Sequence, residues 1–293
     1  MATFDASKLN LQFMKYRKLW MIISLVCVLA SVGLLVTKGL NLSVDFTGGL
    51  VLQLKFDKHV EVSDIRSSLS AIGQGQATIQ SYDNNDVLIR CQAQDETVRR
   101  QLLDTLKKDF GGYTVLKIDK VGPVVGNELR TQAIISLLFA MAGILIYMAF
   151  RFKFRFGVAA VLSLAHDSLL MLGVYSLTGK EVSVSFIAAV LTVVGYSLND
   201  SIVILDRVRE NWSHVRSDGV VKLVDTSLNQ TLSRTINTSL TTLLPVIAMY
   251  VFGGEVISNL AFAFLVGILV GTYSSIYVAS SVVVEWYLRS PKY

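Results

Sequence analysis

Apolar residues along this chain form long runs, and short polar or charged segments separate them. A run of about 18–20 apolar residues is long enough to cross the hydrocarbon core of a bilayer as a helix. The pattern predicts six membrane-spanning helices at residues 19–37, 132–150, 157–177, 184–206, 236–252 and 259–285. The chain is therefore expected to be an integral, α-helical membrane protein.

Residues 38–130 differ from the rest of the chain, because charges are frequent there and apolar residues alternate with polar ones. This pattern predicts strands at residues 49–56, 77–81, 87–92 and 113–121, and helices at residues 62–72 and after Asp95. The order β-α-β-β-α-β is that of a small α+β ferredoxin-like domain. We expect this domain outside the membrane, with its middle strands joined by a turn at residues 83–85.

Lysine and arginine gather in alternate loops, which indicates how the spans are oriented. The basic segments are the N-terminal arm, residues 151–155, residues 207–234 and the C-terminal tail. With six spans they all fall on one side, so both termini, residues 1–18 and 288–293, are expected in the cytoplasm. Spans two to six then lie within residues 131–287, and the domain of residues 38–130 is periplasmic.

The composition supports a membrane protein and argues against an enzyme. Of the 293 residues, 17% are charged, compared with about 25% in an ordinary soluble domain. Cys27 lies in an apolar run and Cys91 in a polar region, so neither a disulfide nor a metal site is expected. The sequence has no nucleophile–base set and no phosphate-binding loop, so we expect no catalytic residues, no cofactor and no use of ATP.

Two carboxylates interrupt the apolar run at residues 184–206. An acid near the membrane centre costs about 2.5–3.5 kcal/mol on insertion scales, and such residues commonly mark proton relays or ion pairs. Asp206 is followed by Arg207 and Arg209, so it is expected at the wet end of the helix. Asp200 lies between one and two turns deeper and is the stronger candidate for a functional group.

Several stretches together resemble the SecD/SecF family of protein-export membrane proteins, which is similar to the RND export superfamily. They are residues 44–49 (VDFTGG), 121–126, 165–167 (AHD), 194–207, 234–240 and 270–277. The resemblance covers nearly the whole chain and implies an RND-like bundle of six helices with a periplasmic insertion. Its structural motif contains Asp45, Gly48 and Gly49. Because glycine permits positive φ or close backbone approach, we expect this turn to fix the outer domain to the first span.

The resemblance also implies a function. Family members are accessory subunits of the Sec preprotein translocase in the bacterial inner membrane, where they use the proton-motive force to promote protein export. The implied partners are SecD in a heterodimer, the SecYEG channel, YajC and the translocating preprotein. In the family, an aspartate of the fourth span and an arginine at the start of the fifth are linked to proton movement. These positions correspond to Asp200 and Arg234.

Proton transfer through a bilayer needs a group that can exist both charged and neutral. Asp200 fits this need if it is ionised beside Arg234 and protonated once the arginine is displaced, although an aspartate can equally serve sodium. A second route is His166 with Asp167, because histidine changes its charge near neutral pH. Neighbouring helix residues point about 100° apart, so we expect these two side chains not to share one face.

Structural roles compete with each of these assignments. Asp200 fits a purely structural ion pair, Arg234 a positive-inside anchor, and His166 with Asp167 a packing feature. Interhelical hydrogen bonds are the structural alternative for the other polar residues of the fourth span, namely Thr192, Ser197, Asn199 and Ser201.

Other features of the last spans predict helix packing. The small residues Gly267, Gly271, Ser274 and Ser275 fit either tight packing within the bundle or a contact with SecD. Pro245 is expected to kink or loosen the fifth span. Residues 220–232, which have apolar positions near helical spacing, are expected to lie along the cytoplasmic surface.

Two other functions are compatible with these residues. One is half of an RND-like exporter of small molecules or lipids, and the other is an assembly scaffold that transports nothing. Unaltered drug or lipid export after deletion would argue against the exporter. An Asp200→Asn protein that assembles normally without supporting protein export would exclude the scaffold.

Overall fold

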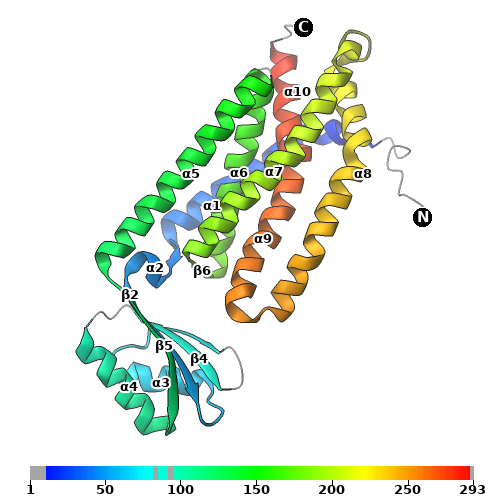
Figure 1. Ribbon diagram of the computed structural model, residues 1–293. Coiled ribbons are helices and arrows are strands. Elements are labelled where there is room, and N and C mark those ends of the chain that lie inside the picture. The colour runs from blue at the N-terminus through cyan, green and yellow to red at the C-terminus, as the bar shows by residue number, and fades with distance from the viewer. Residues whose placement is uncertain (1–10, 82–84, 92–94, 153, 291–293) are drawn as a thin grey trace.

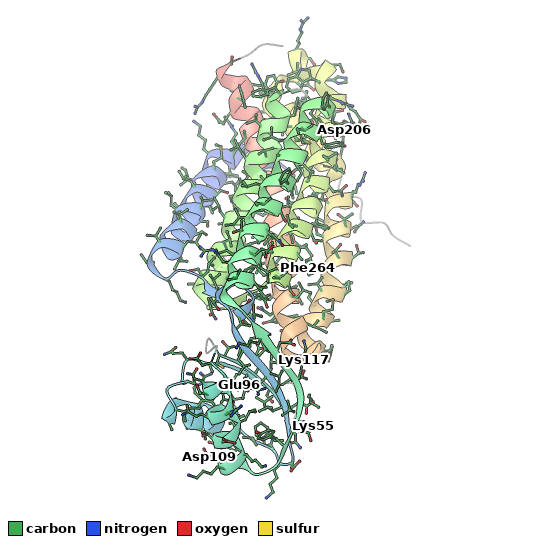
Figure 2. The ribbon with its side chains drawn as sticks, turned by 60° about the vertical axis from the view of Figure 1, so that its left-hand side comes forward. Lys55, Glu96, Asp109, Lys117, Asp206 and Phe264 are labelled. Atoms are coloured by element: carbon green, nitrogen blue, oxygen red, sulfur yellow. The ribbon has the colours of Figure 1, made fainter. Side chains whose placement is uncertain are left out.

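The chain folds into a long helical bundle with a small β-sheet domain at one end (Figure 1). The computed structural model describes residues 11–81, 85–91, 95–152 and 154–290. Parts of the basic N-terminal arm, of the basic segment at residues 151–155 and of the C-terminal tail lie outside the described residues. Residues 83 and 84 of the expected turn also lie outside them. Figure 2 shows Asp206 near the end of the bundle that is far from the domain, and Lys117 and Glu96 on the domain itself.

Five helical stretches in the described part of the chain are long and apolar enough to cross a membrane, which makes the chain a membrane-embedded protein. They are Phe13–Thr37, Val124–Arg151, Phe154–Thr178, Val184–Phe252 and Ile257–Arg289. The fourth stretch joins α7 (Val184–Glu210), η3 (Asn211–His214) and α8 (Val215–Phe252). Two predicted spans therefore fall within one continuous helical stretch.

The helices extend beyond the apolar runs that predicted them. The first stretch contains the 3-10 helix η2 (Phe13–Tyr16) and α1 (Arg17–Thr37). The helix α5 (Pro123–Arg151) begins well before the predicted start at residue 132. Proline suits this first helical position because its missing N–H would have no helical partner there. The helix α6 (Phe154–Thr178) follows directly.

The helix α8 contains both the expected surface segment and the predicted fifth span. Gly219 has non-helical angles (φ 75°), and from there residues 220–232 continue into the rest of α8 instead of forming a separate surface helix. This segment packs against the N-terminal residues, where the Met14 N–H donates to Asp225 Oδ1 at 2.8 Å. Pro245 lies inside α8, where the helix continues through it. Non-helical backbone angles in α8 occur at Gly219, not at Pro245.

The last apolar run forms α9 (Gly254–Ser274), the π-helical turn η4 (Ser275–Ala279) and α10 (Ser280–Arg289). Beside the π turn, the Ser280 side chain Oγ donates to the Ser275 carbonyl at 3.3 Å. π turns inside α-helices are rare and frequently occur at functional sites.

The β-sheet domain has a single packed core. Its elements are β2 (Gly49–Phe56), α3 (Val62–Ala71), β3 (Thr78–Ser81), β4 (Asp86–Cys91), α4 (Glu96–Phe110) and β5 (Tyr113–Val121). The strands form one antiparallel sheet in the order β3-β4-β2-β5. Leu52 and Leu54 of the central strand are fully buried, as are Ile65 of α3 and Leu102 of α4, so both helices cover the apolar face of the sheet.

The domain joins the bundle through more than its two chain connections. The strand β1 (Asn41–Leu42) follows α1 and pairs in parallel with β6 (Glu181–Val182), which lies between α6 and α7. Arg90 of β4 forms an ion pair with Glu181 of β6. The short helix α2 (Val44–Thr47) then leads into β2. The start of the sheet is thereby attached to the loop before α7.

Candidate functional site

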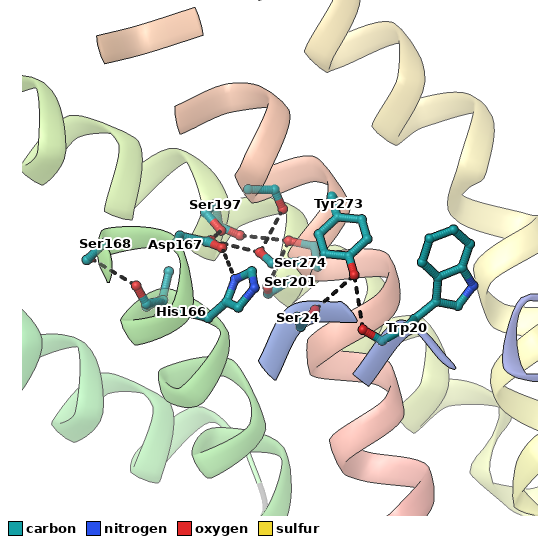
Figure 3. Close-up of polar contacts among 12 residues, drawn as sticks. Trp20, Ser24, His166, Asp167, Ser168, Ser197, Ser201, Tyr273 and Ser274 are labelled. Carbon is teal, nitrogen blue, oxygen red and sulfur yellow. Dashed lines mark hydrogen bonds and ion pairs between the residues drawn. The ribbon is translucent and has the colours of Figure 1, made fainter. Parts of the chain in front are cut away.

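Asp167 of α6 lies at the centre of a buried polar cluster. Its carboxylate is completely buried, and its Oδ2 accepts hydrogen bonds from Ser197 Oγ at 2.6 Å and from Ser274 Oγ at 2.8 Å. These serines belong to α7 and α9, and Figure 3 shows both pointing at the carboxylate. One carboxyl group therefore links three helices of the bundle, and the bond from Ser197 is as short as charge-assisted hydrogen bonds between oxygens are.

His166 contacts Asp167 directly, although the two were expected not to share a face. His166 Nδ1 lies 3.0 Å from Asp167 Oδ1, and both side chains are buried. The expectation was wrong because the imidazole and carboxylate are long enough to meet even though their Cα–Cβ directions diverge. The imidazole stacks at 6.2 Å from the ring of Tyr273, whose hydroxyl lies 2.8 Å from Ser24 Oγ of α1 (Figure 3). Among the described residues, His166 Nε2 has no hydrogen-bond partner.

More serine hydroxyls continue the cluster towards the π turn. Ser201 Oγ of α7 lies 3.0 Å from Ser275 Oγ, and Ser275 Oγ also donates to the Ser197 carbonyl at 3.3 Å. From the sequence, Ser274 and Ser275 were predicted only to be small packing residues. Their spacing from Gly267 and Gly271 was visible, but their role as hydrogen-bond donors depends on which helix they face.

The small residues of α9 pack against α7 of the same chain. A Cβ on Gly267 would lie 2.5 Å from Val193, and one on Gly271 would lie 3.0 Å from Ser197. The alternative of a SecD contact for this face is therefore wrong, because α7 already covers it. Close backbone approach also explains how the short serine side chains can reach across the helix boundary.

Asp200 of α7 is buried in a different way. Its side chain is 3% exposed, and its Oδ2 has no hydrogen-bond partner among the described residues. Two side chains of α8, one turn apart, interact with the Asp200 carboxyl: Arg234 through its charge and Thr238 through its hydroxyl. No ion pair within 4.0 Å joins Asp200 to Arg234 in the part of the chain that is described. The two residues expected to couple protons thus lie on neighbouring helices within electrostatic range, but not in contact.

Arg234 and Asn199 are both exposed on the outside of this single chain. The exposed positions in the middle of α7 are Ala188, Thr192, Gly195 and Asn199, and on α8 the exposed positions include Arg234, Asn237 and Thr241. We call these positions the α7–α8 polar face. An arginine facing lipid is costly, and charged residues within membrane spans usually face another protein element or a water-filled cavity. Of the candidates in the fourth span, Ser197 and Ser201 make interhelical bonds, whereas Thr192 bonds to the Ala188 carbonyl of its own helix.

The residues of the structural motif lie where the domain meets the bundle. Asp45 Oδ2 accepts the Val184 N–H at 3.2 Å and so caps the start of α7. Gly48 has a φ of 73°, a value that side chains disfavour. A Cβ on Gly126 of α5 would lie 3.0 Å from the Gly48 nitrogen and the Phe46 carbonyl oxygen, so α5 passes close to this turn.

Asp206 lies at the opposite end of α7 and has full ionic partners. Its carboxylate pairs with Arg151 at 2.8 Å and with Arg209 at 3.0 Å. The side chain is 28% exposed, in agreement with the prediction that it marks the end of the helix. The three aspartates of α6 and α7 therefore differ in environment: Asp167 is buried and bonded, Asp200 is buried with an unpartnered oxygen, and Asp206 is paired near the surface.

Comparison with known proteins gives one consistent result. The family model "Protein export membrane protein SecD/SecF, C-terminal" matches residues 101–289, and "SecD/SecF GG Motif" matches residues 33–60. The protein translocase subunit SecF of Desulfurispirillum indicum is 44% identical over 285 residues, which cover 94% of this chain and 91% of the relative. The SecF subunit of Vibrio alginolyticus is 42% identical, with coverage of 93% and 89%.

A longer relative has the same region as part of one chain. The protein translocase subunit SecDF of Thermus thermophilus is 46% identical over 87% of this chain but only 35% of its own length. The crystal structure of SecDF from the same organism, described as a translocon-associated membrane protein, superposes with a TM-score of 0.85 at 43% identity. That match covers 95% of this chain and 39% of the solved chain.

Proposed function

This chain belongs to the SecD/SecF family of protein export membrane proteins, and we propose that it is a translocase subunit that promotes preprotein export together with SecD. The names of its relatives support this role, and they describe transport subunits rather than enzymes. The longer SecDF relative supports SecD as the partner, because it holds the matching region and nearly twice as much additional sequence in one polypeptide. The SecYEG channel, YajC and the preprotein are the further partners of this proposal.

The proposed topology has six spans with both termini in the cytoplasm. The stretch Val184–Phe252 contains 69 residues, which would be roughly 100 Å long as one helix at 1.5 Å per residue. The hydrocarbon core is only about 30 Å thick, so this stretch fits two crossings that turn at η3. The basic residues Arg207, Arg209 and Arg216 beside this turn support its cytoplasmic position. The β-sheet domain, with its ferredoxin-like order of elements, is then periplasmic.

The proposed coupling group is the Asp200 carboxyl, with Arg234 as its counter-charge. The observation that carries this proposal is a buried carboxylate oxygen without a partner, next to a helix that presents a cation within electrostatic range. An ionised Asp200 attracts Arg234, and a protonated Asp200 releases it. The α7–α8 boundary thus has two arrangements that differ by one proton, which is what a proton-driven cycle requires.

The α7–α8 polar face is the proposed contact with SecD. It combines small residues with Asn199 and Arg234, and such faces suit helix–helix association better than lipid. A partner on this face would also exclude lipid from the surroundings of Arg234. The coupling pair would then lie close to the boundary between the two subunits.

The test compares wild type, Asp200→Asn and a matched control, Asp206→Asn, in inverted membrane vesicles that contain this chain and SecD. The measurements are completion of preprotein export, its loss on adding a protonophore, and recovery of SecD with the purified chain. We expect Asp200→Asn to assemble normally and to lose the gradient-dependent part of export, with Asp206→Asn unchanged. A sodium gradient imposed in place of the proton gradient separates the two ions.

Full gradient dependence in Asp200→Asn would overturn the assignment of Asp200. The coupling site would then have to lie at His166 and Asp167 or in SecD. Normal export by Asp200→Asn with no gradient dependence in wild type would instead support the scaffold function.

A further inference from the structure

An open, largely apolar groove runs between α1 on one side and η4 and α10 on the other, on a part of the surface that the proposed coupling does not use. Its volume is about 520 Å³, within the range of roughly 300–1,000 Å³ typical of small-molecule sites. The wall on one side is formed by Met21, Leu25 and Val28 of α1, and the other by Val278 and Val282. Apolar side chains form both walls, whereas the polar and charged lining residues lie at one end and on the floor, so a ligand with an apolar chain and a polar head fits it.

The groove has the length of one membrane leaflet. It follows α1 from Lys18 to Val28, a distance of roughly 15 Å at 1.5 Å per residue. This is half of the roughly 30 Å hydrocarbon core. A groove of this length accommodates one acyl chain, which spans a single leaflet.

The rim of the groove is basic at one end. Lys18 and Arg289 line it there, and both are exposed. The single acid at this end, Glu285, already pairs with Arg17 at 2.8 Å, and Arg289 lies at 3.9 Å from its other oxygen. The rim therefore has an excess of positive charge. Basic pockets between membrane helices are a recognised way of holding anionic lipid head groups.

The floor of the groove has one polar atom with hydrogen-bonding capacity to spare. His166 lines the groove, its side chain is 6% exposed, and its Nε2 has no partner among the described residues. The neighbouring Ser24 lies six residues beyond Lys18 along α1, which is roughly 9 Å deeper. Buried polar groups are normally hydrogen-bonded, so a ligand in the groove could supply the missing partner of Nε2. At this depth, below the charged rim, it faces the glycerol and ester region of a lipid better than its phosphate.

We propose that this groove binds one anionic glycerophospholipid. The phosphate lies between Lys18 and Arg289, and one acyl chain follows α1 over Met21, Leu25 and Val28. The inference uses only the groove and the membrane environment, so it stands independently of proton coupling by Asp200. A lipid in this position covers the exposed side of the His166–Asp167 cluster and holds α1 against α10.

The experiment is native mass spectrometry of the full chain in detergent, titrated with dioleoyl phosphatidylglycerol or dioleoyl phosphatidylcholine. We expect one tightly retained phosphatidylglycerol and no comparable retention of phosphatidylcholine. Lys18→Gln combined with Arg289→Gln should weaken phosphatidylglycerol binding about 30-fold, since each basic residue near the surface contributes about 1 kcal/mol and tenfold corresponds to 1.4 kcal/mol. Arg216→Gln, which removes an exposed cation outside the groove, is the matched control and should change nothing.

A second variant tests the acyl-chain part separately. Leu25 is 58% exposed, so Leu25→Trp should fold normally while filling the groove, and it should abolish retention with the rim cations intact. Equal binding of the two lipids, or equal loss in Arg216→Gln, would overturn the proposal. So would loss of bound lipid when SecD is coexpressed, because the groove would then be an interface between proteins.

Discussion

Asp167 and Asp200 are almost equally buried, yet the structure predicts opposite effects for the same substitution. Asp167 is 0% and Asp200 is 3% exposed. Leucine has the same number and branching of side-chain heavy atoms as aspartate and no polar atoms, so Asp167→Leu and Asp200→Leu both remove a carboxyl group and leave an apolar side chain in its place. The difference between the two variants therefore reports what each carboxyl group was bonded to.

The expected loss for Asp167→Leu follows from the groups that it leaves behind. Ser197 Oγ and His166 Nδ1 lose their partner, whereas Ser274 Oγ keeps the Gly271 carbonyl at 3.1 Å. A buried polar group without a partner costs about 1–3 kcal/mol, so two give about 2–6 kcal/mol. Interhelical hydrogen bonds in membrane proteins average about 0.6 kcal/mol, which makes about 1 kcal/mol the lower limit.

Asp200→Leu should cost less than about 1 kcal/mol or increase stability. The substitution removes a buried oxygen that has no partner. It leaves Thr238 satisfied, because the Thr238 hydroxyl lies 3.0 Å from the carbonyls of Arg234 and Thr235. A functional group held in an unfavourable site commonly lowers stability in this way.

Unfolding of the purified chain in mixed micelles of dodecyl maltoside and sodium dodecyl sulfate, followed by far-ultraviolet circular dichroism, measures both effects. Asp167→Asn is the control for chemistry at that site. Its carbonyl can still accept from Ser197 and its amide can face His166, so it should lose less than Asp167→Leu. Equal destabilisation by Asp167→Leu and Asp200→Leu would refute the reasoning, because Asp200 would then have a structural partner. No loss in Asp167→Leu would show that the cluster adds nothing to stability.

Two further predictions concern packing and the domain junction. Gly267→Ala should lower stability by about 1–3 kcal/mol in the same unfolding assay, because the new Cβ would lie 2.5 Å from Val193. Gly143→Ala is the control, because its Cβ would meet nothing within 4 Å. It should leave stability unchanged or raise it by up to about 1 kcal/mol. Asp45→Ala should cost about 0.5–1.5 kcal/mol as one lost hydrogen bond, because it removes the acceptor of the Val184 N–H while the N-cap residue Ser183 remains. It should also speed hydrogen exchange of the Val184 amide, with Glu61→Ala as an exposed control. Unchanged exchange at Val184 would contradict the capping role of Asp45.

The sequence predicted elements best where a pattern coincides with the physical boundary of the element. The strands β2 and β5 have the bounds that alternation indicated, because the two strands pair with each other from one end to the other. Apolar runs mark only the part of a helix that fits the membrane. The start of α5 at Pro123 was missed for this reason, because polar residues continue that helix beyond its apolar part. Residues 220–232 had the predicted helical spacing, but their continuity with the fifth span in α8 was not predicted.

The candidate site could be predicted in its residues but not in its bonds. The cost of an acid in a membrane span was enough to single out Asp200 and Asp167. Which of them has partners depends on the rotation of α6, α7 and α9 about their axes, and on how closely Gly271 lets two helices approach. Neither quantity can be read from spacing along one chain. The same limit hid Ser274, whose hydroxyl matters only because it faces Asp167.

The two faces of α7 indicate where this bundle can rearrange. One face is bonded to α6 and α9 through Ser197 and packed against glycines, so a shift there breaks hydrogen bonds and close contacts together. The other face carries Asp200, whose free oxygen gains rather than loses when a charge approaches from α8. The same helix begins at Val184, whose N–H is bonded to Asp45. Val184 is 16 residues before Asp200, which is roughly 24 Å along one helix. A movement of the β-sheet domain that displaces this cap acts on α7 directly. We therefore expect protonation of Asp200 and movement of the β-sheet domain to be coupled at the α7–α8 boundary. The Asp167 cluster is then the fixed side against which α7 moves.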